Sequence, residues 1–400
     1  MDTRKKKLTV NAAMCDMTRL TEESLSAYEA IEINAATIAL SPRAKELASR
    51  LSLTMNAAQI IQVEEGTQIS IKNGKAEITG NEAPASPTML IVNGKLIIHP
   101  DSAEALKGYA SISVNGKLLY PRSLGPLLNR VQVQGLSMSY PDDAILVEGR
   151  LRVDELFVLR AKGSLYFVMG DLVMADESLD IKPLAEKRTR FSVKNAYIAQ
   201  KHLKDALPLF DDKTHITTIP EGFRFVEEEN TLSAHMISRF GKHLFFPGKL
   251  TIPRDQENAL RQLEGLQVAG SIKLPETLLD TLIALDPQYH KLITYKGLLV
   301  TDKSSLTISQ ALIAQNPEGL TVEDCGVVTL DADISAQEIL DKLTIRDCGT
   351  ILCQPDQEMA LIQIADDVGS ITVANADEST QPENKEDSNH EKINTAYYQF

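Results

Sequence analysis

Ile91-Val92-Asn93-Gly94-Lys95-Leu96 and Ser113-Val114-Asn115-Gly116-Lys117-Leu118 are two copies of one pattern, with their asparagines 22 residues apart. In each copy, apolar residues that alternate with other residues lead into Asn-Gly, and a second apolar stretch follows. Alternation of this kind is typical of a half-buried strand. Asn and Gly both tolerate a positive φ, so the backbone can turn a corner between the two stretches. Each copy therefore predicts a strand, a turn and a second strand.

The same pattern extends in both directions along the chain. Earlier copies carry Asn-Ala-Ala, as in Ile31-Glu-Ile-Asn-Ala-Ala, and later copies carry Asp-Cys-Gly, as in Val322-Glu-Asp-Cys-Gly. The asparagines of the first six copies are Asn11, Asn34, Asn56, Asn73, Asn93 and Asn115. About fifteen copies with a period near 22 residues identify a repeat protein.

A short amphipathic stretch follows the second strand in many copies. Prolines such as Pro42 and Pro275 precede these stretches, and proline is preorganised for the first turn of a helix. Ala and Leu recur there at spacings of three and four, as in residues 335–343, which gives one apolar face. One unit cannot bury that face alone, whereas stacked units can.

The unit resembles a leucine-rich repeat, which also has a strand, an asparagine-bearing turn and a helical return within 20–29 residues. The resemblance is architectural, because the leucine-rich consensus is not matched and Asn115 follows Val114 directly. It implies an α/β solenoid of about fifteen stacked strand–turn–strand coils, most with a short helix. A parallel β-helix, with strands on every side, is the alternative.

The composition changes near the two ends of the chain. We expect a basic N-terminal leader over residues 1–7 and a single solenoid over residues 8–374, with irregular or inserted coils over about 171–247. Residues 375–400 are polar and acidic, and such a composition predicts a disordered tail.

The net charge and the shortness of the apolar runs argue against two classes of function, nucleic-acid binding and membrane insertion. The net charge of −14 argues against a nucleic-acid-binding surface. No run approaches the ~18 apolar residues of a membrane span, and no apolar segment of a signal peptide follows the basic start. Four cysteines in 400 residues fit a reducing compartment, so we expect a cytoplasmic protein with no membrane partner.

Two groups of residues are candidates for a partner surface. Stacking would align Lys75, Lys95 and Lys117 in a basic ladder suited to an acidic partner; a solvated turn face is the plainer interpretation. Residues 157–246 hold nine of the ten phenylalanines. They include the candidates Phe223, Phe225 and Phe245, for which core packing is the alternative.

Cys325 and Cys348 occupy the same place in consecutive Asp-Cys-Gly copies and form a candidate redox pair; packing as small buried side chains is the plainer interpretation. Asp324 and Asp347 precede them in a row of two carboxylates. No zinc-type Cys or His spacing, phosphate loop or nucleophile elbow is present. The sequence therefore predicts no catalytic residue, cofactor or metal site.

These patterns support three functions. The first is a non-enzymatic scaffold or recognition solenoid that binds another protein along its stacked strands. The second is end-to-end self-association through exposed strand edges. The third is a carbohydrate-binding protein or enzyme of the β-helix type.

Overall fold

The computed structural model describes residues 6–50, 53–64, 66–373 and 390–400. Every strand pair in these residues is parallel, and the strands form seven sheets. The chain divides into two compact units. Unit 1 contains the described residues up to Ala144 together with those from His390, and unit 2 contains those from Ile145 to Val373.

The first sheet of unit 1 has the strand order β28-β1-β2-β3, so the last strand of the chain lies beside the first. Its strands are β1 (Lys6–Met17), β2 (Tyr28–Leu40), β3 (Leu53–Gln62) and β28 (His390–Gln399), and its helices are α1 (Glu22–Ser26) and α2 (Pro42–Arg50). Helix α2 begins at a proline, in agreement with the helix starts predicted from the sequence.

The second sheet of unit 1 has the order β4-β5-β6-β7 and contains the Asn-Gly-Lys copies. Its strands are β4 (Gln68–Ile78), β5 (Thr88–Ile98), β6 (Tyr109–Pro121) and β7 (Val131–Tyr140), joined by α3 (Ala103–Lys107) and the 3-10 segment η1 (Arg122–Arg130). Each predicted pair of short strands is here one long strand with a bend at its glycine, because hydrogen bonding to the neighbouring strand continues through the corner.

Unit 2 begins with two sheets whose strands alternate along the chain, ordered β12-β10-β8 and β14-β13-β11-β9. These strands are β8 (Ile145–Val147), β9 (Leu151–Arg152), β10 (Leu165–Val168), β11 (Leu172–Met174), β12 (Arg190–Val193), β13 (Asn195–Ala199) and β14 (His215–Ile219). The helical segments between them are α4 (Glu155–Arg160), α5 (Lys182–Glu186), η2 (Gln200–His202), α6 (Leu203–Ala206) and η3 (Leu207–Leu209).

The middle of unit 2 is one sheet in which β18 pairs with β16, β17 and β19, and β16 also pairs with β15. Its strands are β15 (Arg224–Phe225), β16 (His243–Phe246), β17 (Leu250–Thr251), β18 (Gly265–Pro275) and β19 (Gln288–Tyr295). Its helical segments are α7 (Ala234–Phe240), η4 (Arg254–Gln256), α8 (Glu257–Gln262), η5 (Glu276–Leu278) and α9 (Leu279–Ala284).

The end of unit 2 repeats one coil four times and gives two sheets, β20-β22-β24-β26 and β21-β23-β25-β27. These strands are β20 (Leu298–Thr301), β21 (Ser305–Ile308), β22 (Leu320–Glu323), β23 (Val327–Leu330), β24 (Leu343–Arg346), β25 (Thr350–Cys353), β26 (Ala365–Asp366) and β27 (Ser370–Val373). The helices between coils are α10 (Gln310–Gln315), α11 (Ala336–Lys342) and α12 (Glu358–Ile364).

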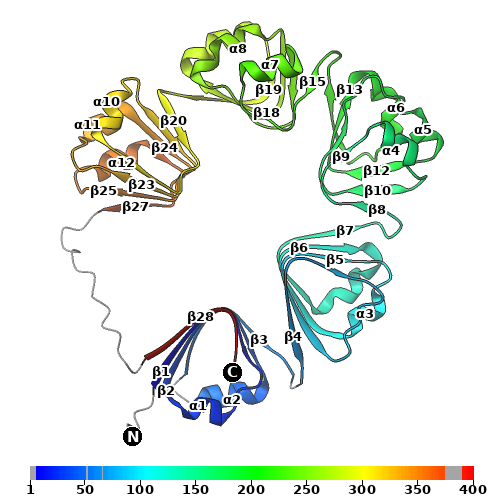
Figure 1. The fold of residues 1–400 in the computed structure, drawn as a ribbon, viewed down its shortest axis with the longest axis vertical. Coiled ribbons are helices and arrows are strands. Elements are labelled where there is room, and N and C mark those ends of the chain that lie inside the picture. Colours follow the sequence, from blue (N-terminus) through cyan, green and yellow to red (C-terminus); the bar gives the residue numbers. More distant parts are fainter. Residues whose placement is uncertain (1–5, 51–52, 65, 374–389) are drawn as a thin grey trace. The chain divides into compact units, whose positions relative to one another are not determined.

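Each group of strands has its own apolar core, closed by its helices, which lie on one side of the strands (Figure 1). Two smaller clusters join neighbouring sheets within a unit. Met14, Ala39, Val63, Met89 and Ile91 join the two sheets of unit 1, and Val173, Tyr197, Ile219 and Phe245 do the same in unit 2.

The fold is thus a set of many short parallel strands in several sheets with helices, and the described strands close no barrel. That the copies form one continuous solenoid over residues 8–374 stays a prediction. Within the described ranges, no helix combines the length and apolarity that crossing a membrane requires.

The expectation for the two ends of the chain needs correction where the structure describes them. Residues 390–399, predicted as part of a disordered tail, form β28 and pair with β1. Residues 375–389 of that tail, and residue 374 before it, lie outside the described residues. Lys6 and Lys7, expected in the leader, already belong to β1, while residues 1–5 are not described.

Candidate recognition cleft

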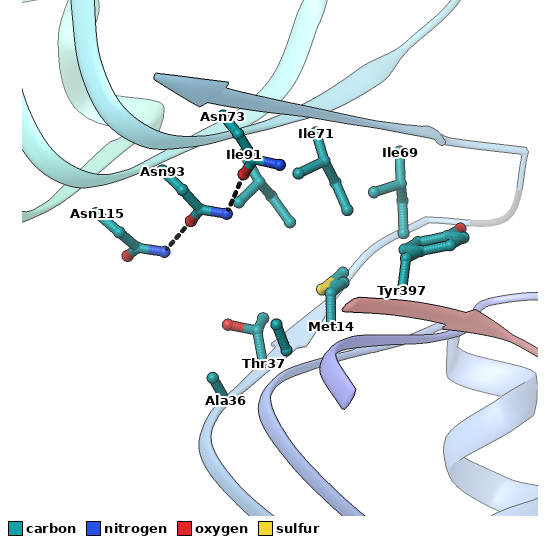
Figure 2. A pocket seen from close by; sticks show the side chains of 11 residues that line it. Met14, Ala36, Thr37, Ile69, Ile71, Asn73, Ile91, Asn93, Asn115 and Tyr397 are labelled. Carbon is teal, nitrogen blue, oxygen red and sulfur yellow. Dashed lines mark hydrogen bonds between the residues drawn. The ribbon is translucent and has the colours of Figure 1, made fainter. Parts of the chain in front are cut away.

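A cleft of about 550 Å3 lies between the two sheets of unit 1 (Figure 2). Apolar side chains from both sheets, including Met14, Ile71 and Ile91, line it together with small residues such as Ala36. Tyr397 of β28 also lines the cleft, so the last strand of the chain contributes to it. This combination of apolar walls and a few polar groups is typical of binding sites.

One wall of the cleft is a ladder of asparagine amides. Asn115 Nδ2 donates to Asn93 Oδ1 at 2.9 Å, and Asn93 Nδ2 donates to Asn73 Oδ1 at 2.9 Å. In the part of the chain that the structure describes, the buried Oδ1 of Asn115 receives no hydrogen bond. The next residue in register is Gln134, whose Nε2 donates to Gln59 Oε1 instead. The ladder therefore ends in an acceptor that has no partner among the described residues.

A column of glycines creates the bend that presents these amides. Gly94, Gly116 and Gly135 have φ angles of 139°, 140° and 138°, a region that side chains disfavour. A Cβ on Gly116 would lie 2.1 Å from the carbonyl oxygen of Gly94. In this sheet, β5, β6 and β7 can therefore follow their neighbours through the corner only with glycine at this position.

The predicted basic ladder is in register. Lys75, Lys95 and Lys117 occupy matching positions of β4, β5 and β6, two residues after each asparagine. Lys75 Nζ lies 2.5 Å from Glu77 Oε1, and this hydrogen bond, followed by one from His99, lowers the pKa of Glu77. A column of lysines thus runs parallel to the amide ladder, and its role in binding a partner stays a prediction.

The three candidate phenylalanines do not form an exposed surface that a partner could contact. Phe245 is 0% exposed, so this candidate is wrong as a contact residue. Phe225 stacks on it with ring centroids 5.7 Å apart, and Tyr197 packs against both rings. The cluster joins two sheets of unit 2, which is the core-packing alternative stated for these residues.

Phe223 and Phe225 are half-buried and line a second cavity, of about 510 Å3, in unit 2. Charged side chains form much of this cavity: Arg152, Asp176, Glu177 and Arg224. Glu177 Oε1 accepts a hydrogen bond from the Gly222 amide at 2.8 Å.

Cys325 and Cys348 occupy matching positions on neighbouring coils, and both thiols are free and buried. Cys325 Sγ donates to the Glu323 carbonyl at 3.3 Å, and Cys348 Sγ to the Arg346 carbonyl at 3.2 Å. Burial raises the pKa of Cys348, which favours the neutral thiol over the reactive thiolate. This environment favours packing; the redox role is untested.

The predicted two-carboxylate row contains four residues. Asp302, Asp324, Asp347 and Asp367 share one register position, and all adopt left-handed backbone with φ between 49° and 59°. The repeat pattern does not reveal Asp302, because its copy has Ser304 where the next copies have Gly326 and Gly349. Aspartate tolerates left-handed backbone better than most residues, so the turn explains the row.

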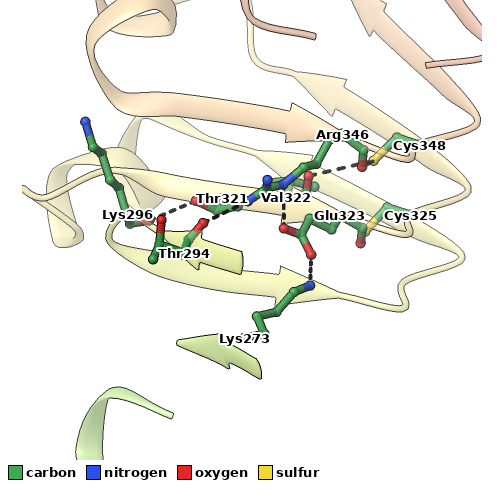
Figure 3. A network of polar contacts seen from close by, with 9 residues as sticks. All are labelled: Lys273, Thr294, Lys296, Thr321, Val322, Glu323, Cys325, Arg346 and Cys348. Carbon is green, nitrogen blue, oxygen red and sulfur yellow. Dashed lines mark hydrogen bonds and ion pairs between the residues drawn. The ribbon is translucent and has the colours of Figure 1, made fainter. Parts of the chain in front are cut away.

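A buried ionic network in unit 2 has no counterpart among the sequence predictions (Figure 3). Glu323, 2% exposed, forms an ion pair with the buried Lys273 and accepts from Arg346 Nε at 2.6 Å. Arg346 also donates to the Thr294 carbonyl at 3.2 Å. Burial lowers the pKa of Lys273, and neighbouring Lys249 lowers it further. Since Lys273 lies on β18 and Glu323 on β22, the network ties two sheets of unit 2 together.

The unit 1 cleft is a candidate site with apolar lining from two sheets. The titratable group that lines it is Tyr397, whose pKa is raised first by burial and then by its hydrogen bond to Asp16. The remaining lining groups offer apolar surface and hydrogen bonds without changing charge. Elsewhere in the described residues, no group of three or more His, Cys, Asp or Glu is placed to hold a metal ion.

Comparison of the chain with protein-family models, curated proteins and solved structures finds no match.

Proposed function

We propose that this protein is a non-enzymatic recognition module that binds an extended segment of another protein in the unit 1 cleft. The observation that carries the proposal is the amide ladder along an apolar cleft, which ends at the unsatisfied Asn115 Oδ1. An extended chain presents backbone donors and acceptors along its length, and side-chain amides can pair with both. The apolar walls would receive alternate side chains of that segment.

The in-register columns of asparagine, glycine and lysine support a finer proposal for the fold. We propose that the copies are leucine-rich-repeat-like coils of an α/β solenoid, since each copy repeats its strand contacts with the next. The lysine column beside the amides favours a partner segment with acidic residues. The four free thiols fit an action in the reducing cytoplasm.

Site-specific photo-crosslinking tests the cleft as the binding site. A photoreactive side chain replaces Ala36, which lines the cleft, and in a matched control it replaces the exposed Glu32 of the same strand. In the source cells, we expect one foreign protein to be captured from position 36 and not from position 32. Capture should fall at least tenfold when Asn93→Leu interrupts the ladder. Equal capture from both positions, or capture that Asn93→Leu leaves unchanged, would contradict the proposal.

A further inference from the structure

The last strand of the chain is another copy of the repeat, although it lies far from the others in sequence. Val10-Asn11-Ala12 of β1 is in parallel register with Ile393-Asn394-Thr395 of β28. Asn11 Nδ2 donates to Asn394 Oδ1 at 2.7 Å, so the C-terminal copy extends the asparagine ladder of the first sheet. The ladder continues from Asn34 Nδ2 to Asn11 Oδ1 at 2.9 Å.

Asp16 at the end of β1 holds the end of this strand. Its Oδ2 accepts hydrogen bonds from the Tyr397 hydroxyl at 2.8 Å and from Gln399 Nε2 at 3.3 Å. Its carbonyl accepts a hydrogen bond from the Phe400 amide at 3.0 Å. Asp16 is 3% exposed, so the acceptor of these bonds is buried, while the bonds themselves are partly buried.

Apolar side chains give the docked strand its packing. Ile393, Tyr398 and Phe400 pack against the core of the first sheet, which includes Leu8 and Val10 of β1. The asparagine ladder, the Asp16 carboxylate and these apolar contacts together favour one kind of strand at the β1 edge. That strand has an aliphatic residue followed by asparagine and a small residue. Strand addition of this kind takes its affinity from backbone hydrogen bonds and its specificity from side-chain positions.

We propose that the β1 edge is a strand-acceptor site whose partner is the C-terminal segment, residues 390–400, of a second copy of this chain. A second copy presents the same segment and makes the same contacts, so exchange needs no new surface. Its Tyr397 would then complete the cleft of the first copy. The chain's own segment is tethered, with an effective concentration on the order of millimolar. In dilute solution it therefore fills the site, and exchange prevails where that intramolecular pairing is weakened.

Complementation between two full-length variants tests the proposal. The first has a disabled donor strand, Ile393→Asp/Tyr398→Asp, and keeps an intact β1 edge. The second has a weakened acceptor, Asn11→Ala/Asp16→Ala, and keeps an intact donor strand. We expect light scattering to show each variant as a monomer and their equimolar mixture as a 1:1 dimer. Two correctly folded variants that remain monomeric when mixed would overturn the proposal.

A peptide measurement keeps the test independent of the acceptor variant. A fluorescent peptide of residues 390–400 should bind the donor-disabled chain at least tenfold more tightly than the unaltered chain, whose site is filled. A matched peptide with Asn394→Leu should bind the donor-disabled chain several-fold more weakly. Failure of the donor-disabled chain to bind the first peptide, with its circular dichroism unchanged, would overturn the proposal, as would equal binding of both peptides. Crosslinking from position 36 tests the binding of a partner in the cleft separately, so the two proposals can fail independently.

Discussion

The strand corner in the second sheet of unit 1 and the strand corner at the end of unit 2 are both built on a column of glycines, but the residue before the glycine has different surroundings. In both, a glycine column passes under the carbonyl of the neighbouring coil: an added Cβ would approach it to 2.1 Å at Gly116 and 2.5 Å at Gly349. The residue before the glycine differs. It is Asn115 in unit 1, which faces the cleft, and Cys348 in unit 2, which packs in the core.

This difference distinguishes the residue that the close approach of neighbouring backbones requires from the residue that the local surroundings determine. In these two columns the glycine is imposed by the close approach of two backbones; the first sheet of unit 1 has Ala12, Ala35 and Ala57 at the matching position. The residue before it is set by whether its side chain meets an open cleft or an apolar core. The amides of Asn73, Asn93 and Asn115 line an open cleft, whereas the thiols of Cys325 and Cys348 pack in a core.

The largest expected loss of stability comes from replacing a glycine of the corner column. Gly116→Ala should lower the free energy of unfolding by about 4 kcal/mol or more, because its Cβ meets a backbone carbonyl and its φ is positive. Gly74→Ala is the matched control, since Gly74 has φ 88° at the same register position but nothing within 4 Å of an added Cβ. It should lose only about 1–2 kcal/mol. Urea unfolding measures both, and equal losses would contradict the close-approach explanation.

The buried network of unit 2 should give the next largest effect. Glu323→Ala leaves the Lys273 ammonium buried without its carboxylate, and the expected loss of stability is about 3 kcal/mol. The control is Glu264→Ala, which removes an exposed ion pair with Lys242 and should not change stability measurably. Thermal and urea unfolding at pH 7 compare the two variants. Similar small losses in both would mean that the network does not hold the two sheets together.

Much of this comparison could be predicted from residue spacing. The steps between Asn11, Asn34 and Asn56 locate in-register asparagines, and the Asp-Cys-Gly copies locate the thiol column. Such predictions succeed because neighbouring coils repeat the same local contacts, so sequence distance translates directly into spatial register.

Contacts outside a column could not be predicted this way. Glu323 meets Lys273 across two sheets, and no repeat relates their positions. Phe245 was misjudged because alternation does not say which strand face is covered. The polar, acidic composition of residues 375–400 predicts disorder, whereas the short copy at Ile393-Asn394 is ordered by pairing with β1, a contact 383 residues away in sequence.

Placing cysteine in the asparagine ladder, and asparagine in the cysteine column, tests the difference between the two corners. We expect smaller losses of stability than in the variants above. Asn93→Cys should cost about 1 kcal/mol, because it removes ladder hydrogen bonds at a site that is partly open to water. Cys348→Asn should cost about 2 kcal/mol, since it buries an amide in the apolar core without an amide neighbour. Urea unfolding of both variants decides the asymmetry. If Asn93→Cys proves the more destabilising, the amide ladder is a structural necessity first and a cleft feature second.

The smallest expected effect concerns the four thiols. Their reactivity should be negligible in the folded chain. Cys15, Cys325, Cys348 and Cys353 are all at most 3% exposed. Burial raises the pKa of Cys15 to about 12, with the Asp16 charge adding to the effect, so its thiol stays protonated from pH 7 to pH 9. A chromogenic disulfide reagent should therefore find no rapid thiol in that range, and four after denaturation.

An exposed cysteine calibrates that measurement. Thr307→Cys on β21 places a thiol on an exposed strand position and should react at least a hundredfold faster than the native four. Rapid modification of Cys325 and Cys348 together, at a rate near that of the added cysteine, would restore the redox pair. It would also remove the contrast between the units, because both corners would then present reactive or binding groups to solvent.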